Sequence, residues 1–262
     1  EHNGFSHQNP GFISNALSKP GCFVHVYFPP DGNSTLAVLE KCLTSKNEIN
    51  IIVAGKTVEP RWLTPTAAKK ELEAGLSIWN FASESNPDIV FAAAGDYLTK
   101  ETLSAIDIFK QEMPEARVRF VNILEVCSLG IGNSGCQVPI VFEDYFTADK
   151  PVIFNFHGYP ETLKQALFDK QTDRRKFFVH GYIENGSTTT PFDMHVRNET
   201  SRYHLVIEAV KELSRLGNIK MERANLVVEK YNKKLANHRE YIKRYGVDPD
   251  EVENWKWTRL TN

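Results

Sequence analysis

Long apolar runs, basic stripes and paired cysteines are all missing from this sequence, and each absence excludes a class of protein. No apolar stretch approaches the ~20 residues that a membrane helix needs, and the start shows no signal-peptide pattern. The 31 Lys and Arg nearly balance the 33 Asp and Glu and are spread along the chain, which disfavours nucleic acid as a partner. Only four of the 262 residues are cysteines, too few and too scattered for a disulfide scaffold. We therefore expect a protein of a reducing, cytoplasmic setting that binds neither membrane nor nucleic acid.

Several catalytic and metal-binding motifs are missing as well. The sequence has no G-x-S-x-G nucleophile elbow, no Walker A loop, no H-E-x-x-H pair and no EF-hand loop. Four histidines, His157, His180, His195 and His204, fall within one region, but no two of them have the spacing of metal ligands on one helix. Packing or surface roles are the better interpretation, so we predict no metal site.

One glycine pattern matches a cofactor motif in letters only. Gly130, Gly132 and Gly135 spell the dinucleotide fingerprint G-x-G-x-x-G after a predicted strand. That fingerprint needs a helix directly after it, because the helix N-terminus holds the pyrophosphate. The residues that follow include Pro139 and have no helical period. Nicotinamide or flavin binding is therefore disfavoured.

A strand–helix–strand pattern is present between residues 88 and 123. Residues 89–94 form a short apolar run that stops at Gly95, as expected of a strand buried on both faces. A helix capped by Thr99 is predicted next, with an apolar stripe at helical spacing, and a second strand is predicted over 118–123. Such a βαβ unit is almost always parallel and right-handed.

An earlier part of the chain repeats the pattern. Residues 23–28 and 49–54 predict two strands, and the helix between them is expected to turn an apolar stripe toward a core. That stripe consists of Leu36, Leu39, Cys42 and Leu43. Lys56 lies just past the carboxyl end of the second strand, the edge at which open α/β sheets bind ligands, and a Lys there suits a phosphate group. A solvated loop Lys is an interpretation of equal standing.

Residues 57–87 interrupt this alternation. A helix is predicted over about 66–79 and no strand, so the segment is interpreted as a connector. Two further strands are predicted at 152–156 and 177–180. The sequence therefore predicts an α/β fold in which residues 88–262 surround a mainly parallel sheet of about five strands, flanked by helices.

The first 21 residues are rich in Gly, Pro and polar side chains, and they predict mostly loop. His2, Asn3 and His7 supply several hydrogen-bonding groups there that could line a polar ligand. An ordinary solvated loop is the simpler interpretation of the same composition. Because the chain opens without Met in the middle of such a loop, we expect it to be a fragment of a longer polypeptide.

Specific strings in this sequence closely resemble those of the phosphoketolases. The most distinctive is N-G-F-S-H-Q-N-P-G-F at residues 3–12. The other matching strings, ordered alike and spread over nearly the whole chain, lie at 26–33, 52–56, 189–194 and 198–205. On these strings the chain resembles the C-terminal part of a xylulose 5-phosphate/fructose 6-phosphate phosphoketolase.

The resemblance implies an architecture and a reaction. Such enzymes are similar to transketolase, with three α/β domains and with thiamine diphosphate and Mg²⁺ between the first two across a dimer interface. Residues 1–57 would end the pyrimidine-binding domain, 58–87 would form the connector and 88–262 a transketolase-like C-terminal domain. The family cleaves a ketose phosphate with inorganic phosphate to acetyl phosphate, an aldose phosphate and water. The implied partners are these two substrates, the rest of the same polypeptide and further copies in a homo-oligomer.

The resemblance also implies roles at matching positions. His7 matches the active-site histidine that contacts the sugar-derived part of the intermediate, where it could transfer protons to and from hydroxyls. His2, Asn3 and Lys56 match groups that resemble phosphate contacts, and a phosphate dianion favours such a mixture of cationic and neutral donors. The family's metal and diphosphate motif, G-D-G followed by a distant Asn, does not occur in this sequence. We therefore expect the chain alone to bind no cofactor or metal and to be inactive.

Two other interpretations stay open. The chain could be a stand-alone α/β domain that binds a sugar phosphate or a nucleotide without catalysis. It could also be a structural domain that forms oligomers. The length of the full gene product separates the first of these from the enzyme, which needs several hundred further residues upstream.

Overall fold

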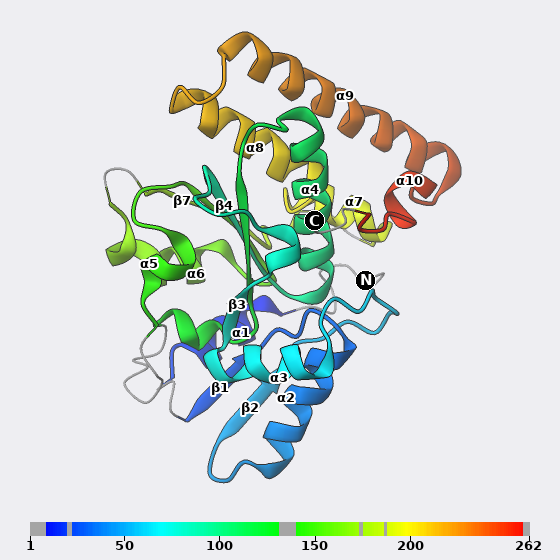
Figure 1. Cartoon of the computed structure of the whole chain (residues 1–262). Coiled ribbons are helices and arrows are strands. Elements are labelled where there is room, and N and C mark those ends of the chain that lie inside the picture. Colours follow the sequence, from blue (N-terminus) through cyan, green and yellow to red (C-terminus); the bar gives the residue numbers. More distant parts are fainter. Residues whose placement is uncertain (1–8, 20–22, 131–139, 173–174, 186–187, 259–262) are drawn as a thin grey trace.

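The computed structural model describes residues 9–19, 23–130, 140–172, 175–185 and 188–258 (Figure 1). The strands are β1 (Val24–Tyr27), β2 (Ile49–Ile52), β3 (Leu76–Ile78), β4 (Ile89–Ala94), β5 (Val118–Ile123), β6 (Val152–Phe156) and β7 (Phe177–His180). The helices are α1 (Pro10–Leu17), α2 (Gly32–Thr44), α3 (Pro65–Ala74), α4 (Asp96–Glu112), α5 (Phe142–Phe146), α6 (Pro160–Leu167), α7 (Pro191–Arg197), α8 (Arg202–Arg215), α9 (Met221–Tyr245) and α10 (Asp250–Glu253). Short 3₁₀ turns are η2 (Asn80–Ala82), η3 (Val126–Leu129) and η4 (Phe168–Lys170).

A five-stranded sheet forms the centre of the molecule, in the order β3-β5-β4-β6-β7. β4 runs parallel to β5 and to β6, and β6 runs parallel to β7. β3 pairs antiparallel with β5 at one edge. The predicted strands at 89–94, 118–123, 152–156 and 177–180 are all confirmed, and so is a largely parallel α/β sheet.

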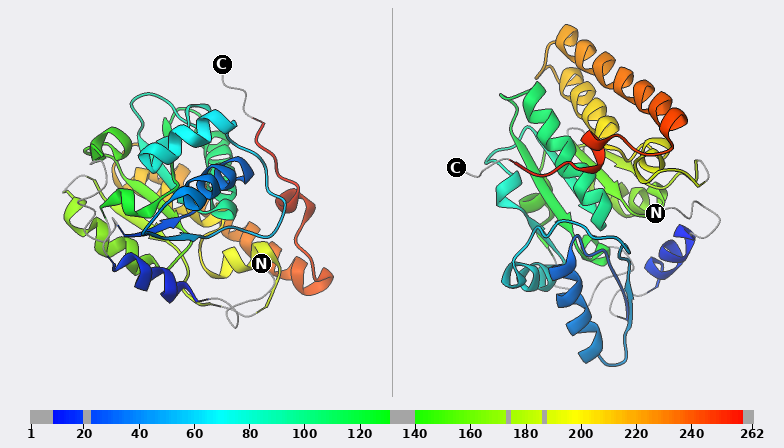
Figure 2. Two further views of the ribbon diagram at one scale, coloured as in Figure 1. Left: turned by 90° about the horizontal axis from the view of Figure 1, so that it is seen from below. Right: turned by 90° about the vertical axis from the view of Figure 1, so that its right-hand side faces the viewer.

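The central strand β4 explains why helices cover both faces of this sheet. Its side chains alternate between two cores: Phe91 packs on the side of α4 and α8, and Val90 packs on the side of α6. All six residues of β4 are buried, as the continuous apolar run predicts. Figure 1 shows the two helical layers, and α9 packs on the outer side of α8, away from the sheet (Figure 2).

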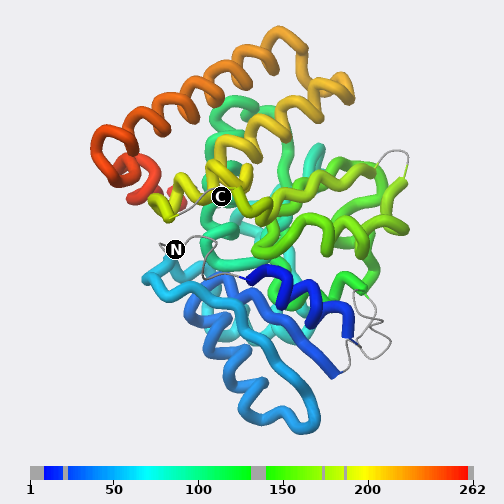
Figure 3. Tube along the Cα trace, turned by 180° about the vertical axis from the view of Figure 1, so that it is seen from behind, coloured from blue at the N-terminus to red at the C-terminus, as the bar shows by residue number. Residues whose placement is uncertain are grey.

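β1 and β2 form a separate parallel pair joined through α2, which confirms the second βαβ unit. This small unit shares a core with the large sheet, because Val24 and Val26 of β1 pack in the same apolar cluster as β4 and β6. α1 packs on β1 (Figure 3). It also reaches α6, through a 2.6 Å hydrogen bond between the hydroxyls of Ser14 and Thr162. The two α/β units are therefore packed against each other rather than merely linked.

Two predictions for residues 1–21 and 57–87 are wrong. Part of the predicted N-terminal loop is α1, which begins at Pro10 and buries Ile13 and Leu17. The connector holds β3, where no strand was predicted. The predicted helix over 66–79 ends at Ala74, because Gly75 adopts a left-handed conformation (φ 78°) and turns the chain into the sheet edge. The fifth strand therefore comes from the connector and not from residues 88–262.

The helix after β4 begins earlier than the sequence suggested. Gly95 caps it with φ 114°, a conformation open to glycine, so that α4 starts directly at Asp96. Thr99 lies inside the first turn and is buried, and its hydroxyl donates to the Asn122 side chain at 3.3 Å. The prediction that Thr99 caps the helix is therefore wrong.

The apolar stripe predicted on α2 does not face a core. Leu36, Leu39 and Leu43 are 66%, 40% and 78% exposed, whereas Val38 is fully buried against Tyr27 of β1. The helix turns its smaller side chains to the strands and its leucines away from them. Of the predicted stripe only Cys42 packs against this cluster. Within the described part of the chain, no helix combines the length and apolarity needed to cross a membrane.

Candidate functional site

The structure describes only one of the predicted site residues. Lys56 lies in the loop after β2, past the carboxyl end of that strand as predicted, and its side chain is exposed. His2, Asn3 and His7 lie outside the described residues. The roles of all four residues stay predictions, and the geometry around Lys56 is the part of the site that can be built.

The carboxyl edges of the two sheets meet beside Lys56. Gly55, after β2, donates its backbone N–H to the Asp96 carboxylate, just after β4, at 2.5 Å. Phe28, after β1, has its ring centroid 6.5 Å from that of His157, just after β6. We call this junction, where loops from both carboxyl edges meet, the seam. Ligands of open α/β sheets bind at carboxyl edges, so the seam has the position expected of a binding site.

β4 and β6 are also the strands between which the crossover direction of the large sheet changes. From β4 the chain passes to β5 on one side, and later to β6 and β7 on the other. Loops diverge at such a switch point in many open sheets and leave a crevice, but in this chain the loops after β4 and β6 touch. A Cβ added to Gly95 would lie 3.0 Å from the Cβ of His157, so the two loops are already in tight contact there.

Aromatic and charged side chains of α4 and α7 line the seam. The rings of Tyr97 and His195 stack with centroids 4.3 Å apart, and His195 Nδ1 lies 2.9 Å from the Thr200 hydroxyl. The Lys100 ammonium lies 5.1 Å from the centroid of the Tyr97 ring and forms an ion pair with Glu59 at 3.4 Å. The loop 55–59 therefore contacts the first two turns of α4.

Burial sets the charge of the seam's titratable groups. It lowers the pKa of His157, although Asp96 acts in the opposite direction. It lowers the pKa of His195 to about 4, against the attraction of Glu101. It also raises the pKa of Tyr97. At pH 7 these three side chains are therefore neutral.

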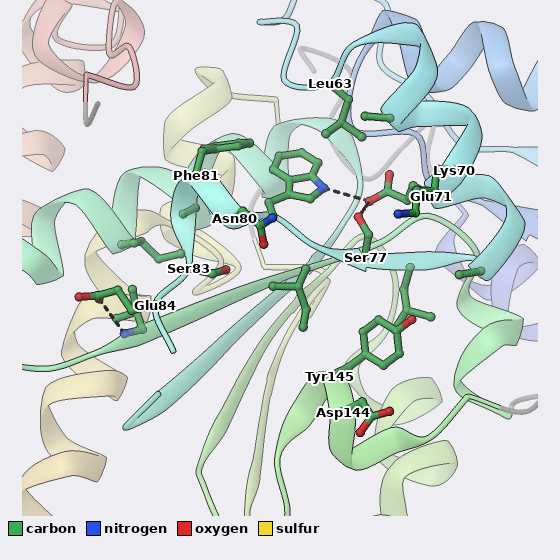
Figure 4. Close-up of a pocket in the computed structure, with 18 of the residues that line it drawn as sticks. Leu63, Lys70, Glu71, Ser77, Asn80, Phe81, Ser83, Glu84, Asp144 and Tyr145 are labelled. Carbon is green, nitrogen blue, oxygen red and sulfur yellow. Dashed lines mark hydrogen bonds between the residues drawn. The ribbon is translucent and has the colours of Figure 1, made fainter. Parts of the chain in front are cut away.

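A cavity of about 1350 Å³ lies elsewhere, along the edge strand β3 (Figure 4). Glu71 lines this cavity and has a shifted pKa. Its carboxylate accepts hydrogen bonds from Ser77 Oγ at 2.5 Å, Trp79 Nε1 at 3.0 Å and Asn122 Nδ2 at 3.0 Å. Burial raises the pKa of Glu71 to about 7 against these three donors. Both carboxylate oxygens are engaged by protein groups, so Glu71 joins α3 to β3 and β5.

Among the residues that the structure describes, no three or more His, Cys, Asp or Glu side chains form a group that could hold a metal ion. Mg²⁺ bound with thiamine diphosphate takes oxygens of carboxylates, amides and the diphosphate as ligands, so it does not require such a group.

Asp96, Lys100 and Glu59 are seam residues that the sequence analysis missed. Asp96 carried a usable signal, because it directly follows a predicted strand and Gly95, at the same kind of edge that drew attention to Lys56. The meeting of the two edges had no sequence signal, since Gly55 and Asp96 are 41 positions apart.

The fold is that of transketolase-like α/β proteins. Transketolase from Leishmania mexicana matches 81% of this chain with a TM-score of 0.58 and 14% sequence identity, over 28% of its own length. Transketolase from Campylobacter jejuni subsp. jejuni matches 79% of the chain with a TM-score of 0.53 and 16% identity, over 29% of its own length. At these identities the likeness defines the class of fold.

Sequence comparison defines the family. The family model described as "XFP C-terminal domain" matches residues 56–257, and that of "D-xylulose 5-phosphate/D-fructose 6-phosphate phosphoketolase" matches residues 1–45. Probable phosphoketolases from Brucella suis biovar 1 and Nitrosomonas europaea are 44% and 41% identical over 98% of this chain. The chain belongs to the phosphoketolase family. It spans about a third of the length of these curated relatives, 33% in each case.

Proposed function

We propose that this chain is the C-terminal portion of a thiamine diphosphate-dependent phosphoketolase. In this proposal the whole protein cleaves xylulose 5-phosphate, fructose 6-phosphate or both with inorganic phosphate, giving acetyl phosphate, an aldose phosphate and water. The observation that carries the proposal is the seam, where the exposed Lys56 follows Gly55 in a loop at which the carboxyl edges of both sheets meet. A phosphorylated sugar or inorganic phosphate is the ligand that this chemistry suits.

The chain's own residues bind and orient substrate in this account. Lys56 supplies a point charge to a phosphate dianion, and His2 and Asn3 add hydrogen-bond donors to it. His7 takes up and returns protons at hydroxyls of the ketose, a role in which an imidazole works well near pH 7. Thiamine diphosphate with Mg²⁺, held by the rest of the longer polypeptide, supplies the carbanion chemistry.

The leucine face of α2 supports a longer polypeptide. Leu36, Leu39 and Leu43 expose apolar side chains on one side of a helix that belongs to a two-stranded sheet. A two-stranded sheet is a small part of an α/β domain, and an exposed apolar helix face marks a contact surface. We assign this face to a part of the longer polypeptide outside this chain, which spans only 33% of the length of a curated relative.

Product analysis on the full-length protein tests the proposed function. Incubation with xylulose 5-phosphate, inorganic phosphate, thiamine diphosphate and Mg²⁺ is expected to give acetyl phosphate, detected as its hydroxamate, in an amount that depends on inorganic phosphate. The present chain alone is expected to give no product and no heat of binding when titrated with thiamine diphosphate and Mg²⁺. Micromolar binding by the chain alone would show that the cofactor site has been misplaced.

Replacement of His7 by alanine tests its role in proton transfer. Because the hydroxyl protons move only during reaction, His7→Ala in the full-length enzyme is expected to lower kcat by roughly 10²–10⁴-fold. Cofactor binding and thermal stability should be unchanged. His25→Ala is no suitable control, because its ring contacts Glu125 at 2.6 Å. The nearby polar substitution Gln8→Ala serves instead. Wild-type turnover of His7→Ala would leave this histidine a loop residue.

A further inference from the structure

The loop that carries Lys56 is fixed by a carboxylate from the other α/β unit. Asp96 accepts the Gly55 N–H through Oδ2 at 2.5 Å and its own neighbour's N–H, that of Tyr97, through Oδ1 at 2.7 Å. Both oxygens are therefore committed at the first residue of α4. A hydrogen bond to a charged group holds a backbone position more strongly than one between neutral groups.

Gly55 is shaped for this contact. A Cβ at this position would lie 2.4 Å from Asp96 Oδ2 and 3.2 Å from its carboxyl carbon. A side chain there would displace either the loop or the Asp96 carboxylate, so the absence of a side chain allows the backbone of residue 55 to approach the carboxylate. The residue that follows is Lys56, whose backbone N is bonded directly to the carbonyl carbon of Gly55.

A second contact fixes the other side of the same loop. Glu59 pairs with Lys100 at 3.4 Å, and the two side chains are only 11% and 13% exposed. Asp96 and Lys100 are four residues apart on α4, so both face the loop from one side of the helix. Between these two contacts, Lys56 and Val58 are exposed. The arrangement holds the loop at both ends and leaves its middle turned outward.

We infer that Asp96 and Lys100 are positioning residues that hold the Lys56 loop in the geometry needed to bind the phosphate group of the substrate. The inference rests on the proposed function of Lys56. Through these two residues α4 contributes to substrate affinity by way of the Lys56 loop. A loop that is ordered in advance does not lose conformational entropy when the substrate binds. Gly55 and Glu59 make the contacts that hold the loop, and the Lys56 ammonium is left to bind the phosphate group.

Kinetics of the full-length enzyme test the inference. Asp96→Ala is expected to raise KM for the sugar phosphate or inorganic phosphate about tenfold, the loss typical of one hydrogen bond to a charged group, with kcat within about twofold. Asp96→Asn keeps an oxygen that can accept the Gly55 N–H, so it should recover most of the affinity. The double variant Lys56→Ala/Asp96→Ala should be no worse than Lys56→Ala alone, because a loop without its lysine has nothing to position.

The chain offers a matched control. Asp88 accepts the backbone N–H of Arg117 at 2.9 Å at the opposite end of β4 and also pairs with the Arg117 guanidinium, so Asp88→Ala removes a backbone contact to a carboxylate, and an ion pair besides, far from the seam. It should leave both Michaelis constants unchanged. Michaelis constants in Asp96→Ala equal to those of the wild type would overturn the positioning role. So would a double variant whose rise in KM equals the product of the rises in the two single variants.

Amide hydrogen exchange on the present chain separates this inference from the proposed function. Asp96→Ala should speed exchange of the Gly55 N–H at least about tenfold, and Asp88→Ala should not change it. Unchanged exchange at Gly55 overturns the contact whatever the enzyme does. Faster exchange together with a full-length protein that forms no acetyl phosphate would overturn the proposed function and, with it, the role in substrate affinity.

Discussion

Replacement of Arg202 by methionine should destabilise the protein strongly. Arg202 and Glu101 are 2% and 0% exposed and join α8 to α4. Three groups of Arg202 donate to the Glu101 carboxylate: the backbone N–H at 2.8 Å, Nε at 3.0 Å and a terminal guanidinium nitrogen at 2.5 Å. Methionine fills similar space but leaves the buried carboxylate with only the backbone donor.

The magnitude follows from this geometry. Breaking a buried ion pair from one side costs about 3–5 kcal/mol, and the retained backbone donor places Arg202→Met near the lower end, at about 3 kcal/mol. For a chain of this size that corresponds to a fall in Tm of about 6–12 °C. The double variant Glu101→Leu/Arg202→Met removes both charges and should come within about 1–2 kcal/mol of wild type.

The destabilisation caused by Arg202→Met should also depend on pH. Burial by itself raises the pKa of Glu101, and Arg202 outweighs burial and lowers it. In the wild type, the contribution of the Glu101–Arg202 pair to stability is fully present above the pKa that Glu101 has in the unfolded chain. It is lost as the pH falls through the lower pKa that Glu101 has in the folded protein. In Arg202→Met the retained backbone N–H of residue 202 opposes burial only weakly, so the folded pKa of Glu101 is raised and stability is lost as pH rises. The difference in unfolding free energy should therefore widen from pH 4 toward neutrality.

Urea denaturation of the present chain, followed by circular dichroism, measures these free energies. Arg223→Met is the control, because Arg223 pairs with Glu115 on the surface, where the two side chains are 45% and 55% exposed, and its loss should cost less than about 1 kcal/mol. A cost below about 1 kcal/mol for Arg202→Met, or strictly additive losses in the double variant, would refute the reasoning.

Two further predictions concern the edge of the sheet and the leucine face. The pKa of Glu71 is about 7 in the folded protein and 4.5 in the unfolded chain. Its contribution to the free energy of unfolding is therefore fully present below pH 4.5 and is lost as the pH rises through 7. The difference between the two pKa values corresponds to about 3 kcal/mol. Between pH 4.5 and 8 the wild type should lose stability relative to Glu71→Gln by about that amount, measured by urea denaturation at several pH values, and parallel pH profiles would contradict it. Leu36→Ser/Leu43→Ser should reduce self-association of the present chain in light scattering while changing its unfolding free energy by less than about 0.5 kcal/mol, because both leucines are exposed. The same variant should lower the Tm of the full-length protein, and an unchanged Tm there would mean that no preceding segment covers this face.

The large sheet could be predicted from the sequence because its strands are buried on both faces. Such strands are continuous apolar runs that end at glycine or a turn, and the pattern does not depend on partners elsewhere. β3 could not be predicted in this way: it is only three residues long, too short to show a strand pattern, although Gly75 separates it from the helix before it. Its position depends on Gly75 and on pairing with β5, which is more than 40 residues away.

Burial of the α2 stripe could not be judged from periodicity. The spacing of Leu36, Leu39 and Leu43 correctly indicates an amphipathic helix, but not which of its sides meets the strands. Tertiary packing turned Val38 inward instead. The candidate site, likewise, could be predicted from the sequence only in part. Lys56 was predicted from its place after a strand, whereas its contacts through Gly55 and Glu59 depend on α4 and had no local signal.

Substitution of Lys56 in the full-length enzyme tests the central claim most directly. Lys46 provides the control, because it is also an exposed loop lysine but lies at the amino end of β2, between α2 and that strand. Since Lys56 is assigned to a phosphate group present before and during the reaction, Lys56→Ala should raise KM for the sugar phosphate or for inorganic phosphate about tenfold or more. kcat should stay within about twofold, and Lys46→Ala should match the wild type in every constant. Unchanged Michaelis constants for both substrates in Lys56→Ala would contradict the assignment of the seam as a phosphate site.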